Sequence, residues 1–557
     1  MSSPFEGEPR PSVTAATNPT DNRGDIRNSP PRTRFRGQGR SPLWSVLLGG
    51  IVMGLAPKPC HAWPLAWFAL APLWQAVIAP GRSPTTKQLF VFGAVWSAAY
   101  HGIVLAWITY LHPLTWMGVP WLASLGIALF AWGFITGLGT VTFGMWAVLL
   151  RRVSDRCGLG RSARILWGTA LWCGLETLLS WGPLAWPFLA LTQSPGNAWI
   201  LHLSQWAGPA AITGAIVAVN GCWAEMINGA NGGQWWRHYR RPIALAGLLL
   251  LVGLHGLGGI LHQQPLGDRP DAALQVGLIQ GNIPTREKLT PAGTRQAITA
   301  YVNGYRQLVQ QGAEAILTPE GAIPELWTSE RQRRNPLLRA VREEGVVLWL
   351  GTFRPVGNPA ARQMTQSLIN IEGTGQTTSQ YDKVKLVPLG EYIPFEATLG
   401  RVISRLSPVS SSLLPGSGDQ IFMTSFGPAA VGICYESPYS ELFRRQVAQG
   451  SEWIMTASNL DPYPPWMMRQ HHAQDVLRAV ESDRWALRVT NTGISGVVDP
   501  HGNTLWLSEP NEYVTYLTQI YRRKSQTIYV KYGNWLTYGL LAIAALISGH
   551  SLRRNAS

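Results

Sequence analysis

The sequence predicts a polytopic α-helical membrane protein of about eight transmembrane helices, with an extracytoplasmic α/β domain inserted before the last helix. Three observations predict this class. Apolar residues make up 46% of the 557 positions and charged residues only 14%, a balance too apolar for an ordinary soluble enzyme. Eight apolar runs approach or exceed the length of a bilayer crossing. Between the seventh and the eighth, the hydrophobic pattern changes from helical to strand-like.

The apolar runs define four parts of the chain. Residues 1–40 are rich in Ser, Pro, Arg and Asn and predict a disordered cytoplasmic tail. Helices one to seven are expected within 41–262, a soluble domain within 263–530, and the eighth helix with a cytoplasmic end within 531–557. The first run is short. The runs lie at about 43–57, 61–80, 88–111, 121–150, 163–182, 198–227, 242–262 and 533–549.

Basic residues indicate which side of the membrane each loop faces. Lys and Arg accumulate before the first run and in alternate loops, whereas the loops around 112–119 and 183–197 contain neither. By the positive-inside rule both termini are cytoplasmic and the soluble domain lies on the opposite face. These loops also account for the +15 net charge, so no nucleic-acid partner is implied. The residues concerned are Arg23, Arg27, Arg32, Arg34, Arg36, Arg40, Arg82, Lys87, Arg151, Arg152, Arg156, Arg161, Arg164, Arg237, Arg240, Arg241, Arg553 and Arg554.

The soluble domain alternates short β-rich runs with helical segments, which indicates a layered α/β domain. Strands are expected at Val276–Ile279, Ala315–Thr318, Val346–Thr352, Ala429–Ile433, Trp453–Thr456 and Trp485–Thr490. Helices are expected near 293–311, 333–345 and 466–483.

Three chemically useful side chains lie at or near the ends of such runs. Cys434 ends a β-branched run and leads directly into Tyr435, a setting that suits a nucleophile on a sharp turn. Glu320 ends the run that begins at Ala315, and Lys383 lies in YDKVKLVPLGEY. Each residue alone has an ordinary explanation: packing for the cysteine, a turn for the glutamate and a solvated face for the lysine.

The remaining Cys and His residues argue against disulfide and metal chemistry. Of five cysteines, only Cys60 and Cys434 are expected on the extracytoplasmic side, and a bridge between them would consume the candidate nucleophile. Cys434 is therefore expected to be free. His471 and His472 are adjacent and cannot share one helical face, and no CxxC, HExxH or phosphate-binding loop is present. No metal and no cofactor is expected.

Glu, Lys and Cys in this order resemble the catalytic triad of the nitrilase superfamily. The whole pattern is similar to its membrane-embedded branch, the apolipoprotein N-acyltransferases, over most of the chain beyond the tail. The Lys383 to Glu391 segment and the Cys-Tyr-Glu triplet are the most specific parts. The matching motifs are VGLIQGNIP from Val276, TPEGAIP from Thr318, YDKVKLVPLGEYIP from Tyr381, GICYE from Gly432, RVTNTGIS from Arg488 and, more weakly, WPFLALTQ from Trp186.

The resemblance implies an αββα sandwich in which Glu320 is the general base, Lys383 stabilises the oxyanion and Cys434 forms the acyl-enzyme. Glu391 would orient Lys383. Glu436 would position Tyr435 or the incoming amine, or else serve as a structural hydrogen-bond partner. The reaction would move a fatty acyl chain from a phospholipid to the α-amino group of a diacylglyceryl-modified apolipoprotein. The enzyme would be a monomer in the bacterial inner membrane, with its catalytic domain periplasmic.

Two segments depart from the family pattern, and two other functions stay open. Members usually carry Trp shortly after Asn-Ile-Pro, where this chain has Lys288 and Leu289, and the usual Asn-Asp-Ala-Trp-Phe is here NLDPYP from Asn459. Both differences concern substrate loops. A membrane-tethered nitrilase-type amidase is one alternative, and a catalytically silent membrane scaffold is the other.

Overall fold

The computed structural model describes residues 42–79, 83–183, 185–228, 235–357, 363–388, 390–392 and 413–556. The tail predicted at 1–40 lies outside these residues. Within them, the helical region and the soluble domain predicted from the sequence are both present.

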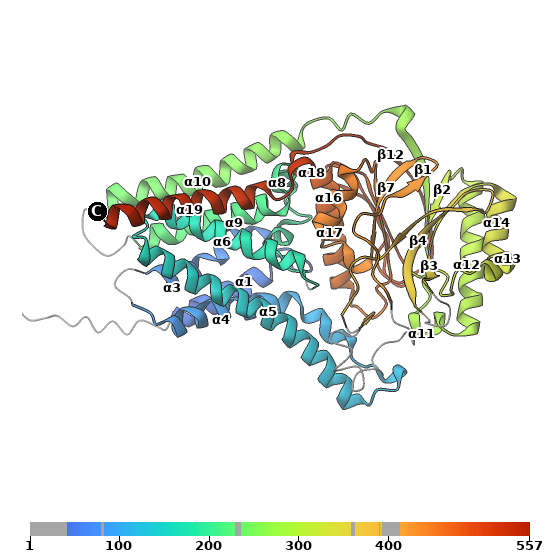
Figure 1. Ribbon diagram of the computed structural model, residues 1–557, viewed down its shortest axis with the longest axis horizontal. Helices are drawn as coiled ribbons and strands as arrows, with labels where there is room; N and C mark the ends of the chain where they lie inside the picture. The colour runs from blue at the N-terminus through green and yellow to red at the C-terminus, as the bar shows by residue number, and fades with distance from the viewer. Residues whose placement is uncertain are drawn as a thin grey trace, which may run out of the picture. The chain divides into compact units, whose positions relative to one another are not determined.

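Apolar helices from both halves of the chain run side by side, on the left in Figure 1. Among the described residues, four are long and apolar enough to cross a membrane: Trp121–Arg156, Pro209–Ile227, Pro242–His262 and Trp535–Arg554. The chain is thus a membrane protein by its helices, while the count of eight spans stays a prediction. The principal helices are α1 (Pro42–Gly54), α3 (Ala71–Ile78), α4 (Thr86–Val104), α5 (Trp121–Arg156), α6 (Arg161–Trp181), α9 (Pro209–Asn228), α10 (Trp235–His262) and α19 (Trp535–Ala556).

Two apolar runs form shorter helices than the sequence predicts. The run at 198–227 breaks at Gly208, whose φ of 63° is left-handed, and Pro209 then begins α9. Its first part forms only the short helices α7 (Ala198–Leu201) and α8 (Ser204–Ala207). The run at 61–80 is divided into η1 (Trp63–Leu65), α2 (Ala66–Ala69) and α3. Hydrophobicity alone does not reveal these breaks, because the interrupting residues are also apolar or small.

The soluble domain is a sandwich of two six-stranded sheets. The first has the order β12-β1-β2-β3-β4-β5 and the second β11-β10-β9-β8-β7-β6. The six predicted strands correspond to β1, β2, β3, β7, β8 and β9. The bounds are β1 (Ala273–Gln280), β2 (Ala315–Leu317), β3 (Val347–Pro355), β4 (Met364–Ile371), β5 (Thr377–Asp382), β6 (Phe422–Thr424), β7 (Gly427–Ile433), β8 (Ile454–Ser458), β9 (Ala486–Thr490), β10 (Gly496–Val498), β11 (Thr504–Leu507) and β12 (Val514–Tyr521).

Helices cover the outer faces and complete the predicted αββα sandwich. On the first sheet lie α12 (Pro291–Gln310) and α14 (Pro336–Glu344), and on the second α16 (Ser440–Ala448) and α17 (Pro465–Ser482). The helix expected at 333–345 is split, because Asn335 caps α14 through its side chain and Pro336 begins the new helix. The preceding turn belongs to α13 (Ser329–Arg334).

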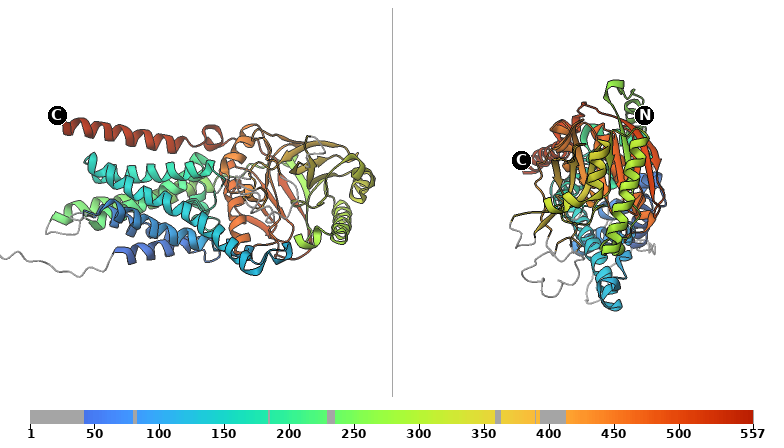
Figure 2. Two further views of the ribbon diagram at one scale, coloured as in Figure 1. Left: turned by 60° about the horizontal axis from the view of Figure 1, so that its bottom comes forward. Right: turned by 90° about the vertical axis from the view of Figure 1, so that its right-hand side faces the viewer.

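Helix α17 lies between the sheets and the helical region (Figure 1; left view of Figure 2). Its polar side chains bond to loops of the helical region: Gln470 Nε2 donates to the carbonyl of Lys58 at 2.8 Å, and Gln474 Nε2 to that of Trp186 at 3.2 Å. In the other direction, Ser194 Oγ donates to the Ala473 carbonyl at 2.6 Å. The helix that supports the second sheet is therefore also the main attachment to the membrane part.

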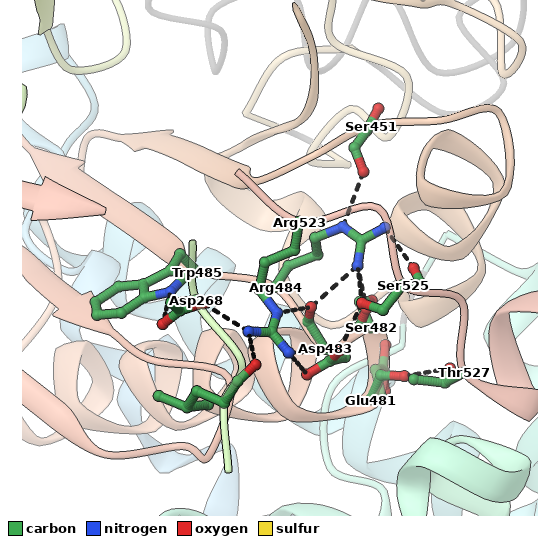
Figure 3. Close-up of polar contacts among 11 residues, drawn as sticks. Asp268, Ser451, Glu481, Ser482, Asp483, Arg484, Trp485, Arg523, Ser525 and Thr527 are labelled. Carbon is green, nitrogen blue, oxygen red and sulfur yellow. Dashed lines mark hydrogen bonds and ion pairs between the residues drawn. The ribbon is translucent and has the colours of Figure 1, made fainter. Parts of the chain in front are cut away.

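Two arginines, Arg523 and the buried Arg484, fasten the two ends of the sandwich domain to each other (Figure 3). Arg523, where the chain leaves the domain, pairs with Asp268, where it enters, at 2.6 Å, and with Asp483 at 2.9 Å. Arg484 donates to the carbonyls of Ser451 and Ser525 at 2.9 and 2.7 Å. Because both linkers lead to membrane helices, this cluster fixes where the domain is tethered.

Candidate active site

Cys434 lies at the turn where β7 ends and a short 3₁₀ helix begins. Its φ is 53°, in the left-handed region that non-glycine residues rarely adopt, so the neighbouring structure must hold the backbone there. The thiol is free, as predicted, and so is the exposed Cys60. Such strain at a buried cysteine is typical of a nucleophile turn.

Glu320 and Lys383 follow β2 and β5, whose carboxyl ends lie at the same edge of the first sheet. Lys383 is fully buried, and its Nζ donates to Glu320 Oε1 at 2.9 Å and to Glu391 Oε1 at 2.5 Å. Although burial alone would lower the pKa of Lys383, the two carboxylates raise it well above its usual value. The lysine therefore stays cationic.

Burial raises the pKa of the Cys434 thiol, and the charge of Glu320 raises it further. The charge of Lys383 acts in the opposite direction. The three predicted residues are thus brought into one electrostatic unit. Because the thiol is protonated at neutral pH, any attack by its sulfur needs a base to remove the proton.

Asn459 links this unit together, and the sequence did not single it out as a site residue. Its backbone N–H donates to Glu320 Oε2 at 2.7 Å, and its carbonyl accepts from Cys434 Sγ at 3.9 Å. The residue opens NLDPYP, directly after β8. A segment that departs from the family pattern therefore still holds the Glu320 carboxylate and the Cys434 thiol.

Glu436 joins the lysine segment to the cysteine strand. Its Oε1 accepts from the backbone N–H groups of Val384 and Lys385 at 2.7 and 2.9 Å. Its Oε2 accepts from the N–H of Ile433 at 2.6 Å and from Tyr381 Oη at 3.1 Å. Four donors satisfy this fully buried carboxylate, so the geometry favours the structural alternative for Glu436.

A second buried network supports the turn from behind and was missed in the sequence. His471 Nε2 donates to the carbonyl of Cys434 at 2.8 Å, while its Nδ1 accepts from the Arg488 guanidinium at 3.2 Å. These bonds assign the neutral Nε2–H tautomer. Arg488 also pairs with Asp475. Arg488 opens the RVTNTGIS motif, but its contact with His471 across two elements leaves no local sequence signal.

Tyr435 connects the nucleophile turn to the helical region. Its ring stacks on Trp186, with centroids 6.3 Å apart and planes 7° apart, and Trp186 also contacts His471 at 5.5 Å. Leu189 in the same loop donates its N–H to Glu176 Oε1 of α6 at 3.0 Å. The weakly matching WPFLALTQ segment thus packs directly against the Cys-Tyr-Glu turn.

Among the residues that the structure describes, no group of three or more His, Cys, Asp and Glu side chains has an arrangement that could hold a metal ion. His471 and His472 are both occupied by hydrogen bonds, His472 to Thr504 Oγ1 at 2.9 Å. The site presents a base, a cation and a thiol, which is the equipment for nucleophilic acyl transfer.

Comparison with known proteins defines the class first. Residues 275–525 match the carbon–nitrogen hydrolase family, and residues 49–222 match the apolipoprotein N-acyltransferase N-terminal domain. The chain is therefore a nitrilase-superfamily enzyme joined to a membrane helical region. An amidase structure from Nesterenkonia is similar at 17% identity and a TM-score of 0.37, covering 49% of this chain and 98% of that one.

Full-length relatives identify the particular family. An apolipoprotein N-acyltransferase from Nostoc is 48% identical over 496 residues, covering 89% of this chain and 96% of the relative. One from Synechocystis is 41% identical over 522 residues, covering 89% and 98%. The chain belongs to the apolipoprotein N-acyltransferase family, and the resemblance inferred from its motifs is confirmed.

Proposed function

We propose that this protein transfers a fatty acyl chain from a membrane phospholipid to the α-amino group of the diacylglyceryl-cysteine of apolipoproteins, through a thioester on Cys434. The observation that supports it most is the set of charged partners around a strained thiol. Lys383 is bonded to Glu320 and Glu391, and Glu320 also accepts from Asn459, whose carbonyl contacts the sulfur. Family membership supplies the substrate class.

In the first half-reaction Glu320 takes the Sγ proton and the thiolate attacks the ester carbonyl carbon. Lys383, oriented by Glu391, and the backbone N–H of Tyr435 stabilise the oxyanion that forms. When the tetrahedral intermediate collapses, the lysophospholipid alkoxide leaves with the proton held by Glu320. Cys434 is left as a thioester.

In the second half-reaction the acceptor amine attacks the thioester and loses a proton to Glu320. Collapse forms the amide and expels the Cys434 thiolate, which recovers that proton. Glu436 and Tyr435 act as positioning residues: the first fixes the spacing of the lysine and cysteine segments, and the second meets the helical region at Trp186.

The proposed setting is the bacterial inner membrane, crossed by about eight helices of a monomeric protein. Both termini are cytoplasmic, and helices within 41–262 and 531–557 hold the catalytic domain, 263–530, in the periplasm. The arginine distribution supports this orientation. A domain on that face can meet the two lipid-anchored substrates by lateral diffusion.

The orientation is tested with an impermeant thiol reagent on intact cells. The exposed Cys60 and a Ser417→Cys variant should be labelled from outside, whereas Ser162→Cys, on the opposite face, should react only after permeabilisation. The buried native Cys157 is a poor reporter. The reverse pattern would rule out periplasmic lipoprotein acylation.

The reaction is tested in its two halves. Enzyme incubated with labelled phospholipid alone should accumulate an acyl thioester on Cys434, detected by mass spectrometry, and should release it to a diacylglyceryl-cysteine peptide with a free α-amino group. Steady release of fatty acid without acceptor, or comparable turnover of soluble amides, would favour the amidase. Absence of any acylation would favour the remaining alternative, a catalytically silent membrane scaffold.

A further inference from the structure

Lys288 is a buried lysine that the mechanism above does not use. It ends the short helix α11 (Thr285–Lys288), and only 3% of the residue is exposed. Its Nζ makes no hydrogen bond or ion pair with any residue that the structure describes. A lysine that is almost entirely buried and bonds to no described residue is unusual, because such a side chain is normally paired.

The amine of Lys288 lies beside the catalytic base. A Cβ atom placed on Gly321, the residue after Glu320, would be 3.8 Å from Lys288 Nζ. Burial lowers the pKa of Lys288 to about 8, although the charges of Glu320 and Asp461 oppose the shift. At neutral pH the group is still mostly cationic.

Helix α11 is tied to the loop that holds the base. The N–H of Thr285 donates to Asp461 Oδ2 at 3.0 Å, and Asn459 Nδ2 donates to Thr285 Oγ1 at 2.8 Å. Helix α11, which ends at Lys288, thus bonds to the NLDPYP segment. Asn459 also binds Glu320, so hydrogen bonds connect the helix that carries Lys288 to the triad.

The charges of the site explain what this cation is available for. Lys383 carries one positive charge and is bonded to two carboxylates, Glu320 and Glu391, which leaves that group with a formal charge of about −1. A phospholipid brings a negatively charged phosphodiester close to its ester groups. Lys383 is held at these two carboxylates by its hydrogen bonds. Among the residues that the structure describes, no carboxylate is bonded to Lys288, so this cation is available to the phosphodiester.

We propose that Lys288 binds the phosphodiester of the acyl donor while Cys434 attacks the donor's ester, and so selects for phosphate-containing lipids. This inference rests on the proposed function. Three N–H donors on a compact charge suit a phosphate oxygen, and the buried setting strengthens the attraction. The residue acts in the first half-reaction only, since the phosphate leaves with the lysophospholipid.

The test measures acylation of Cys434 separately from transfer, using the full-length enzyme in detergent. Lys288→Gln should slow acylation by subsaturating phospholipid at least tenfold and raise the apparent KM for that donor. Lys288→Arg should restore most of the rate. Acylation by a p-nitrophenyl fatty ester, which has no phosphate, should be unchanged. Transfer from preformed thioester to the acceptor peptide should also be unchanged.

A matched control is Lys524→Gln, which removes a lysine whose side chain is 82% exposed, and which should behave as the wild type. Equal slowing of both donors by Lys288→Gln would show a structural role, and slowing confined to the transfer step would assign the lysine to the amine; either overturns the proposal. An unchanged phospholipid rate in Lys288→Gln would overturn it as well. If the Gln variant does not fold, the Lys288→Arg variant serves instead. Its failure to prefer phospholipid over the phosphate-free ester would overturn the proposal. Failure of the wild type to form any thioester would instead refute the proposed function.

Discussion

Two buried glutamates, Glu320 and Glu436, flank the turn at Cys434, and their carboxylates accept different numbers of hydrogen bonds. On one side, Glu320 accepts two hydrogen bonds, from Lys383 Nζ and the N–H of Asn459. On the other, Glu436 accepts four, from three backbone N–H groups and Tyr381 Oη. A carboxylate offers about four acceptor positions. Among the described residues, Glu436 has donors for all four positions, whereas Glu320 has donors for two and keeps capacity for a proton.

The number of accepted hydrogen bonds distinguishes a glutamate that can exchange a proton from one that only supports the structure. Burial and charge do not distinguish the two. Both glutamates are buried, both adjoin the nucleophile turn and both lie in motifs typical of the family. A saturated carboxylate can only hold its donors in place, while an unsaturated one beside a thiol can exchange a proton with it. The same distinction applies to two cations: Arg488 is bonded to His471 and Asp475, whereas Lys288 bonds to no residue that the structure describes.

The largest effect is expected at the nucleophile itself. Cys434→Ala should lower acyl transfer by at least about 10⁴-fold, because no other group can form the thioester. The variant should remain folded, since the smaller alanine side chain fits the space that the cysteine occupies. Turnover with the labelled phospholipid and the acceptor peptide measures the effect. Substantial activity in this variant would falsify the thioester mechanism.

The next effect tests the unsaturated side of the comparison. Glu320→Gln should reduce turnover by about 10²–10⁴-fold, because the amide cannot take the Sγ proton. Its thermal unfolding should change less than that of the corresponding Glu436 variant, because only two hydrogen bonds are affected. A variant that unfolds easily yet retains activity would place Glu320 with the structural residues.

The sequence predicted those site residues that a local sequence pattern marks, and it missed those that meet only in the folded protein. Glu320 and Cys434 follow β-rich runs, which form β2 in the first sheet and β7 in the second, so local pattern and motif order were sufficient to select them as candidates. His471 and Arg488 meet only because α17 crosses β9 behind the turn, which no local period encodes. The role of Glu436 stayed open for the same reason: its donors come from segments about fifty residues apart.

The fold shows the same limit. The alternation of strands and helices predicted a layered α/β domain, and the motifs identified the family and with it the αββα sandwich. The strands β4, β5, β6, β10, β11 and β12 were not predicted, because several are short, polar or partly exposed. In the helical region, breaks at Gly208 and within Trp63–Ile78 depend on how helices pack, so apolar runs gave the right region without its helix ends.

The saturated side predicts a stability effect with a smaller loss of activity. Glu436→Gln replaces two acceptor positions with an N–H₂ group that faces backbone donors. The free energy of unfolding should fall by about 1–3 kcal/mol, and turnover by about tenfold or less, since the base and the nucleophile remain. Thermal unfolding in detergent and the acylation rate provide the two readouts. A loss of turnover as large as that of Glu320→Gln, with unchanged stability, would give Glu436 a chemical role.

The smallest effect is expected on stability at low pH, through the buried His472 of α17. Burial lowers the pKa of His472 to about 3, from an ordinary value near 6.5. Between these values the unfolded chain takes up a proton that the folded protein does not, so stability is complete above pH 6.5 and declines as the pH falls. The slope for one such residue is at most about 1.4 kcal/mol per pH unit. His472→Gln, which can keep the bond to Thr504, should show a shallower decline than the wild type in unfolding measured between pH 7 and 4. Parallel curves would mean that His472 is protonated in the folded protein as readily as in the unfolded chain.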